Sequence, residues 1–485
     1  MRMPTQNGPT QNGPTPTRPT QTAPRQTAPR QTLPRQTLPP QTPPLPRAAA
    51  PCAVAPPADA ARRVLLRRGL LGPVLASLSG PSGSISALAA EDTAIRPGRV
   101  LSFPQDHGAH IGNGIEWWYV TGWLQAPGGA PGALGASSAS NASSASNASS
   151  ASGAAAAQAE LFGFQLTFFR SRTGVDSAMA GRFVPRQLLF AHAALSDIAG
   201  QRHHSAQRLD RWSGDAAAAG AALPSGDTAA AGAAPPSAHA ALADTALALG
   251  AWTLSRSASG AQAYAPYQAR VAAPEAGFTL ALQLQPTQPL LLQGQAGYSQ
   301  KGPLAAQASH YYSQPQLAVS AVLTRAGRPR TLTGRGWLDH EWSDALLAPG
   351  AVGWDWIGIN LADGGALTAF VLRRADGSAL WAGGSHRPAG GAVRNFAPTE
   401  VGFEPQRTWR SPATGTVYPV QWRITTPHGT VVLRALLDAQ ELDSSASTGT
   451  VYWEGLAELL APGGARIGLG YLEMTGRGRA LRLGL

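Results

Sequence analysis

The sequence predicts an all-β protein from about residue 98 onward. Three observations support this fold class. Short segments in which aromatic residues alternate with small or polar ones are typical of strands. These segments recur at short, even spacings, and no long segment has a convincing helical period apart from Ala-rich stretches. Many short strands at even spacing favour a sandwich or barrel over a fold of alternating strands and helices.

The predicted strands follow one another along the body of the chain. They cover residues 114–124, 160–170, 188–195, 252–255, 264–271, 278–284, 317–324, 352–360, 367–373, 417–425, 430–437, 451–460 and 468–475. Two low-complexity insertions interrupt them. Residues 127–158 contain a short Ala/Ser/Asn repeat between two strands, which predicts a flexible hairpin loop. Residues 213–248 are rich in Ala, Gly and Pro, with a short helix near 240–249 or none.

The net charge of +11 comes mostly from the N-terminal leader. Residues 1–90 hold ten Arg and one acidic residue, whereas residues 91–485 hold 28 basic and 26 acidic residues. The body therefore lacks the basic surface that nucleic-acid binding requires, and we expect no nucleic-acid partner. The only cysteine, Cys52, lies in the leader, which excludes an internal disulfide, thiol catalysis and a Cys-ligated metal in the body.

The leader itself has two parts. Residues 1–61 are rich in Pro, Thr, Gln and Ala, a composition that predicts disorder. Residues 62–90 contain paired arginines, a short apolar run and an Ala-Leu-Ala site, which together predict a signal peptide cleaved near Ala89-Ala90. The arginine pair resembles a twin-arginine signal, although the general secretory route stays open. We therefore expect an exported protein, periplasmic or secreted.

One acidic motif lies between tryptophans in a segment that reads as a strand. On a strand, Trp337, Asp339 and Glu341 share one face, while His340 and Trp342 share the other. Two carboxylates beside an apolar wall raise each other's pKa, so one of them could act as a general acid. The other, or His340, could then hold or deprotonate a water. The alternative is structural: the carboxylates cap backbone groups or pair with a neighbouring arginine.

A second motif begins with Glu116, followed by Trp117, Trp118 and Tyr119. On a strand, Glu116 and Trp118 point to one side and Trp117 to the other. The functional interpretation places Glu116 in a cavity with Trp118. The alternative is a buried glutamate that pairs with an arginine across the sheet. The sequence leaves both interpretations open.

Further aromatic residues accompany polar groups later in the chain. Asp355 lies between Trp354 and Trp356, so it faces away from both on a strand. It either supports the histidine of the acidic motif or is a hydrogen-bonded strand residue. Tyr311 and Tyr312 could donate hydrogen bonds into a cavity or simply pack. The histidines show no metal-ligand spacing, and neither a phosphate loop nor a nucleophile elbow occurs, so we expect no metal and no cofactor.

Several ordered motifs carry a resemblance to a known family. They are Glu116-Trp117-Trp118-Tyr119 with Thr121-Gly122, Ser309-His310-Tyr311-Tyr312-Ser313, Trp337-Leu338-Asp339-His340-Glu341-Trp342, Gly353-Trp354-Asp355-Trp356, Leu372-Arg373, Tyr452-Trp453-Glu454-Gly455 and Gly470-Tyr471-Leu472-Glu473-Met474-Thr475-Gly476. Over residues 98–476 the chain resembles the AttH-like, carotenoid 1,2-hydratase-like family of lipocalin-like, predicted secreted hydrolases. It departs from that pattern at Gly476-Arg477, where Gly-Tyr is expected.

The resemblance implies two consecutive lipocalin-like antiparallel β-barrels, residues 91–342 with both insertions and residues 343–485, around an apolar cavity. It also implies a hydratase or hydrolase that acts on an isoprenoid or lipid-like substrate. Asp339 or Glu341 would be the acid, and His340 or Glu116 would position water. The substrate-binding residues would be Trp117, Trp118, Tyr119, Tyr311, Tyr312, Trp337, Trp342, Trp354, Asp355 and Trp356. The alternative is a non-enzymatic lipid carrier that works with an envelope ABC-type transporter or at a membrane surface.

Overall fold

The computed structural model describes residues 93–128, 161–174, 185–212, 237–257, 264–345 and 347–481. The predicted leader (1–61), the predicted signal peptide (62–90) and most of the two insertions lie outside these residues. Within the described part, no helix is long and apolar enough to cross a membrane.

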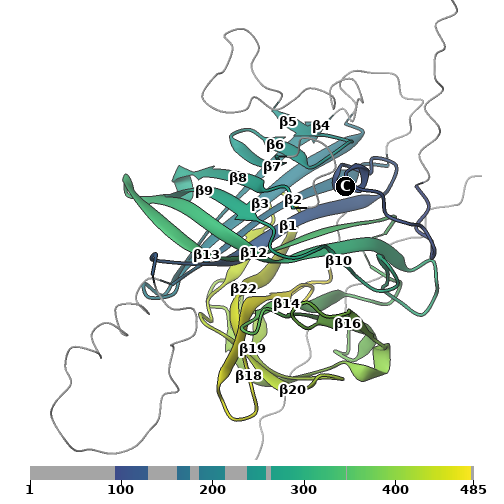
Figure 1. The fold of residues 1–485 in the computed structure, drawn as a ribbon. Helices are drawn as coiled ribbons and strands as arrows, with labels where there is room; N and C mark the ends of the chain where they lie inside the picture. Colours follow the sequence, from purple (N-terminus) through teal and green to yellow (C-terminus); the bar gives the residue numbers. More distant parts are fainter. Residues whose placement is uncertain are drawn as a thin grey trace, which may run out of the picture. The chain divides into compact units, whose positions relative to one another are not determined.

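The first half of the chain forms a barrel-like antiparallel sheet of thirteen strands (Figure 1). Its strands are β1 (Ile115–Gln125), β2 (Phe162–Arg172), β3 (Gln187–Asp197), β4 (Arg202–Trp212), β5 (Ala238–Ala240), β6 (Ala246–Leu249), β7 (Trp252–Arg256), β8 (Tyr267–Ala273), β9 (Phe278–Gln285), β10 (Leu291–Leu292), β11 (Tyr298–Gln300), β12 (Ala308–Arg325) and β13 (Arg328–Ser343). The order is β4-β3-β2-β1-β13-β12-β9-β8-β7-β6-β5, and β10 and β11 also pair with β12. The first strand thus pairs with the last, which brings the two sequence motifs on β1 and β13 side by side.

The second half forms a separate antiparallel sheet of ten strands. Its strands are β14 (Gly353–Leu361), β15 (Ala366–Arg373), β16 (Ala379–Arg387), β17 (Arg394–Phe396), β18 (Gly402–Arg410), β19 (Val417–Thr426), β20 (Gly429–Ala435), β21 (Glu441–Ser444), β22 (Thr450–Leu460) and β23 (Arg466–Met474). The order is β17-β16-β15-β14-β23-β22-β20-β19-β18, with β21 on β22. Here too the first strand, β14, pairs with the last. Short 3-10 turns occur at η1 (Gln105–His107), η2 (Pro274–Ala276) and η3 (Pro398–Glu400).

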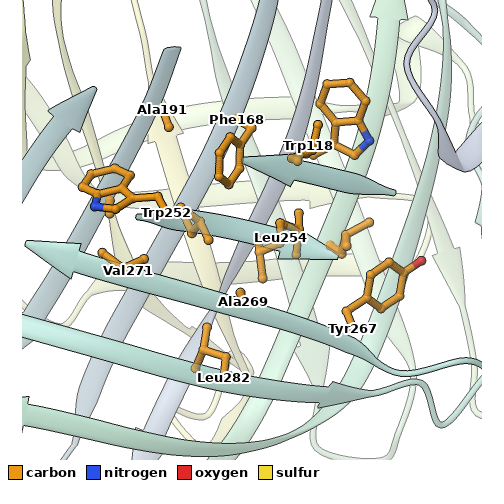
Figure 2. Packing of buried hydrophobic residues seen from close by; sticks show 14 of the residues in the cluster. Trp118, Phe168, Ala191, Trp252, Leu254, Tyr267, Ala269, Val271 and Leu282 are labelled. Carbon is orange, nitrogen blue, oxygen red and sulfur yellow. The ribbon is translucent and has the colours of Figure 1, made fainter. Parts of the chain in front are cut away.

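Side-chain alternation divides the buried residues into three main groups. One face of the first sheet encloses an apolar core, in which Trp118 and Phe168 gather with Trp252 and Leu254 (Figure 2). The second sheet encloses its own core. A third cluster joins residues of both sheets, among them Tyr119, Trp337, Trp356, Phe370 and Tyr471. Residues one position apart on β1 or β13 therefore enter different environments, and those of the third cluster border the space between the sheets.

The structure confirms the all-β fold and the predicted strands within the described residues. In place of the short helix considered near 240–249, β5 and β6 pair with each other. The polar strand β4 was missed because most of its residues are half-buried or exposed, so it lacks the apolar alternation of a covered strand.

Candidate functional site

A pocket with a cavity volume of about 110 Å³ lies between the two sheets and opens to solvent. Its walls combine aromatic rings with ionisable groups. The first sheet contributes Trp117, Tyr119, Phe169, His192, Lys301, Tyr311, Asp339 and Glu341, and the second contributes Trp354, Trp356, Phe370, Tyr452, Glu454 and Glu473. Apolar walls with a few placed polar groups are typical of a small-molecule site.

Asp339 is the best-anchored carboxyl group in the pocket. Trp337 Nε1 donates to Asp339 Oδ1 over 2.7 Å, and the Ser313 hydroxyl donates to the same oxygen over 2.5 Å. The Tyr311 hydroxyl donates to Oδ2 over 2.9 Å. Burial raises the pKa of Asp339 to about 7, although these three donors favour the charged form and act against the rise. Asp339 can therefore exchange a proton near neutral pH while its position stays fixed.

Glu341 shares the face of Asp339 and is paired with a cation. Lys301 is the only lysine in the chain, and its Nζ lies 3.0 Å from Glu341 Oε1. The Ser309 hydroxyl donates to the same carboxylate oxygen over 2.5 Å. Lys301 also lies 4.8 Å from the centre of the Tyr311 ring and 4.4 Å from that of Phe370, within the range of cation–π attraction.

The second sheet adds a pair of glutamates that lie opposite each other on two adjacent strands. Glu454 on β22 and Glu473 on β23 are direct cross-strand partners. Burial and the neighbouring Glu473 raise the pKa of Glu454 well above its ordinary value. Burial also raises the pKa of Glu473 to about 7, and repulsion from Asp339 and Glu341 adds to the rise. Because two like charges at such a pair are unfavourable in an apolar site, at least one member holds a proton at neutral pH.

Two buried polar groups in the pocket wall act on each other. Glu454 Oε1 and the Tyr119 hydroxyl have no other partner among the described residues. After burial, the neighbouring Glu454 raises the pKa of Tyr119, and the Tyr119 hydroxyl opposes the rise in the pKa of Glu454 that burial causes. Tyr119 therefore helps to hold the Glu454 carboxyl group at the pocket wall.

A different cluster occupies the opposite face of the first sheet. Arg170 Nε lies 2.8 Å from Glu116 Oε2, and the two residues are direct cross-strand partners. His110 Nδ1 lies 2.7 Å and His340 Nε2 lies 2.9 Å from Glu116 Oε1. The other ring nitrogen of His110 lies 3.0 Å from Asp106 Oδ1. All five side chains are buried.

The donors and acceptors in this cluster show whether it is an ion-pair network or a metal site. His110 faces a carboxylate oxygen at each ring nitrogen, so both nitrogens must donate and the ring is an imidazolium. Glu116 and Asp106 accordingly raise the pKa of His110 against the opposing effect of burial. His110 Nδ1, Glu116 Oε1 and His340 Nε2 lie close enough together to hold a metal ion. However, these atoms already satisfy one another at hydrogen-bond distance and Arg170 neutralises Glu116, so the residues fit an ion-pair network better than a metal centre.

The predicted site residues are thus divided between two places. At the pocket between the sheets lie Asp339, Glu341, Trp117, Tyr119, Tyr311, Trp354 and Trp356, with Trp337 bonded to Asp339. In the core of the first sheet lie Glu116, His340, Trp118, Tyr312 and Trp342. There the Trp118 ring stacks on His340 with ring centres 4.6 Å apart, and His340 Nδ1 lies 3.0 Å from the Tyr312 hydroxyl. The structure therefore does not bring Glu116 or His340 to Asp339 and Glu341.

Asp355 is placed away from the pocket, as strand alternation predicted. Trp354 and Trp356 line the pocket, whereas Asp355 forms ion pairs with two arginines. Arg373 Nε lies 2.9 Å and an Arg477 nitrogen 2.5 Å from Asp355 Oδ2. Arg477 is the position at which the chain departs from the expected Gly-Tyr pattern, so this departure supplies a partner for a buried carboxylate.

Sequence reasoning missed the glutamate pair as functional residues. Both glutamates lie in mostly apolar strands that were themselves predicted: Glu473 is the one acidic residue of β23, and Glu454 shares β22 with Glu458. A turn over 461–465 joins these strands, and simple pairing outward from it would place Glu454 opposite Leu472. A register shift between Leu459 and Leu460 moves Glu454 opposite Glu473 instead, and the sequence carried no signal of that shift. Nothing in the sequence indicated that the pair would face Asp339, because this depends on how the two sheets pack.

Comparison with known proteins agrees with this architecture. The family described as AttH-like matches residues 151–477. The solved structure of an AttH protein from Nitrosomonas europaea is 40% identical and has a TM-score of 0.63, covering 79% of this chain and 99% of that one. Kievitone hydratase from Nectria haematococca shares the fold at 12% identity and a TM-score of 0.50, covering 79% of this chain and 97% of that one. No curated protein sequence matches. The chain therefore belongs to the AttH-like family, as its ordered motifs predicted.

Proposed function

We propose that this protein hydrates a carbon–carbon double bond of a hydrophobic, isoprenoid or lipid-like substrate in the pocket between the two sheets. The observation that carries the proposal is the Glu454–Glu473 pair, two carboxyl groups that face each other at an aromatic pocket and whose pKa values are both raised by burial. A carboxylic acid kept neutral by its surroundings is suited to protonate a weak base such as an alkene. The hydratase-like fold of the family supports the same reaction class.

The proposed reaction has two steps. Glu454 transfers its proton to one alkene carbon, which breaks the π bond, forms a C–H bond and leaves a tertiary carbocation. The faces of Trp117, Trp354 and Trp356 stabilise the cation through their π electrons. A water then forms the C–O bond and releases a proton to Asp339, whose pKa of about 7 suits a general base.

This assignment changes the roles expected from the sequence. Asp339 is proposed as the base instead of the acid, and Glu341 as a carboxylate held by Lys301 at the pocket wall. Glu116 and His340 have structural roles in the core of the first sheet. The signal peptide predicted over residues 62–90 leads us to propose that the protein is exported, so that its substrate is a lipid-like compound met outside the cytoplasm.

A prenylated phenol is a direct probe of the proposal. We expect mass spectrometry to show the gain of one water as a tertiary alcohol, with the oxygen derived from labelled solvent water. Glu454→Gln and Asp339→Asn should each lower the rate by about 10² to 10⁴-fold, the usual contribution of a positioned proton-transfer group. Glu458→Gln is the matched control, because Glu458 lies on the same strand but pairs with Arg434 outside the pocket.

The alternative function is non-enzymatic lipid carriage to an envelope transporter. Native mass spectrometry of the purified protein distinguishes the two. An intact lipid that is bound equally by the wild type and by both pocket variants, with no conversion of prenyl probes, would contradict the hydratase proposal and favour the carrier.

A further inference from the structure

Gln293 is a buried glutamine between the two sheets, one residue after β10. Its backbone N–H donates to the Tyr311 carbonyl oxygen over 3.0 Å, which continues the pairing of β10 with β12. Its side-chain amide contacts hydroxyl groups of both sheets. Gln293 lies outside the pocket wall, and none of the reaction steps proposed above uses it.

Two cross-strand pairs meet at this amide, one from each sheet. In the first sheet, Ser313 on β12 lies opposite Asp339 on β13. In the second sheet, Thr368 on β15 lies opposite Ser385 on β16. Gln293 Nε2 donates to Ser313 Oγ over 2.8 Å and to Thr368 Oγ1 over 3.2 Å. The Ser385 hydroxyl donates to Gln293 Oε1 over 2.8 Å. All five residues are buried.

The amide decides where the single proton of the Ser313 hydroxyl points. An amide nitrogen donates and offers no lone pair, so Ser313 can only accept from Gln293 Nε2. The Ser313 proton is then directed to Asp339 Oδ1, 2.5 Å away. Ser385 holds the amide in this orientation, because its hydroxyl donates to Oε1. A flipped amide would present Oε1 to Ser313, so that the Ser313 proton could leave Asp339.

The same directions close one oxygen of Asp339 to protons. A carboxylate oxygen has two lone pairs, and Oδ1 already accepts from Trp337 Nε1 and from the Ser313 hydroxyl. A proton on Oδ1 would have to displace the Ser313 proton, which the Gln293 nitrogen cannot accept. Oδ2 accepts from the Tyr311 hydroxyl, its one donor among the described residues, and keeps a second lone pair open.

We propose that Gln293 is a positioning residue for the base: it fixes Ser313 as a donor to Asp339 Oδ1, so that Oδ2 receives the proton. The proposal rests on the proposed hydration. As the C–O bond forms, one O–H bond of the attacking water breaks, its electron pair stays on the product oxygen and its proton binds Oδ2. Gln293 and Ser313 keep their own protons. Asp339 then returns a proton to pocket water and Glu454 takes one up, so no net proton is consumed.

This network favours the ionised form of Asp339. Successive hydrogen bonds polarise one another, so donation from Gln293 makes Ser313 a stronger donor to the carboxylate. Weakening the network should therefore raise the pKa of Asp339. The other charged or titratable groups that face Asp339 are unchanged in the variants below; they are Tyr311, Glu341 with its partner Lys301, and Glu473.

Infrared titration of the full chain tests the network without a substrate. The carbonyl band of protonated Asp339, identified by its loss in Asp339→Asn, should have a midpoint near pH 7. Ser313→Ala should raise this midpoint by about one pH unit, the scale of one hydrogen bond to a charged group. Gln293→Leu and Ser385→Ala should each raise it by part of that amount. Neither should raise it further when combined with Ser313→Ala, because both act through Ser313.

The frequency of the same band identifies the oxygen, since a carbonyl stretch falls as its oxygen accepts more hydrogen bonds. With the proton on Oδ2, Oδ1 is the carbonyl oxygen. Ser313→Ala should then move the band to higher frequency, and Tyr311→Phe should leave it in place. Gln165→Leu is the matched control. Gln165 is equally buried and donates to the Thr167 hydroxyl in the pocket wall over 3.0 Å, outside the Asp339 network, so neither midpoint nor frequency should change.

An unchanged midpoint in Gln293→Leu and Ser385→Ala, or shifts that add to that of Ser313→Ala, would overturn the role of Gln293. Ser385→Ala removes only a hydroxyl and decides alone if Gln293→Leu does not fold. A band moved by Tyr311→Phe instead of Ser313→Ala would overturn the assignment of Oδ2. Failure of the hydration proposal gives a different result: prenyl probes are not converted, while the shifts of midpoint and band persist.

Discussion

Replacing Glu116 by glutamine tests the conclusion that this residue is part of an ion-pair network. Glu116 is fully buried and accepts from Arg170, from both His110 and His340 rings, and from the His110 backbone. The change leaves the shape of the side chain intact but removes the charge that balances Arg170 and the His110 imidazolium. Breaking a buried ion pair by removing one partner costs about 3 to 5 kcal/mol, and we expect a loss of this size in the free energy of unfolding.

Urea unfolding at several pH values measures this effect. Glu404→Gln is the control, since Glu404 pairs with Arg423 at the surface and the change should cost about 0 to 1 kcal/mol. The raised pKa of His110 adds stability that is full below its ordinary value of 6.5 and is lost as pH rises through the raised value. Glu116→Gln should weaken this decline on the alkaline side. A loss of stability no larger than that of Glu404→Gln, with prenyl conversion abolished, would refute the structural assignment and restore Glu116 as a functional residue.

Three further outcomes are expected. Asp355→Asn should lower the free energy of unfolding by about 3 kcal/mol in urea, because it leaves Arg373 and Arg477 without a carboxylate; an unchanged unfolding midpoint would contradict the importance of this pair. Glu473→Gln should stabilise the protein above pH 7 by on the order of 2 to 3 kcal/mol. The raised pKa of about 7 means that the wild-type protein loses stability as pH rises from 4.5 to 7, a loss that glutamine does not suffer. Equal stability of the two proteins at high pH would show that Glu473 ionises freely. Gly122→Ala should cost about 1 to 3 kcal/mol in thermal unfolding, because its Cβ would lie 2.3 Å from the Arg335 carbonyl oxygen and 2.7 Å from the Phe164 ring. A neutral effect would show that both the β13 backbone and the ring move aside.

The motifs on β1 and β13 show which features of the site strand alternation can predict. Strand alternation correctly separated Asp339 and Glu341 from His340, and Asp355 from its flanking tryptophans. The same rule placed Glu116 and Trp118 together. Alternation depends only on backbone geometry, so it needs no knowledge of neighbours. It could not tell which face of β1 and β13 would meet the second sheet, and it therefore left Glu116 and His340 as candidates for the same site as Asp339.

The sequence by itself determined the all-β fold, the family and the sharing of a strand face by Asp339 and Glu341, because each depends on residue order and a period of two. Only the tertiary structure decided that Glu454 and Glu473 complete this site and that Glu116 belongs to an ion-pair network. The physical reason is that a carboxyl group's protonation depends on burial and on the charges that packing brings beside it. Arg170 and His110 lower the pKa of Glu116 and so favour its ionised form, whereas burial in the pocket and the neighbouring Glu473 raise the pKa of Glu454 and so favour its protonated form.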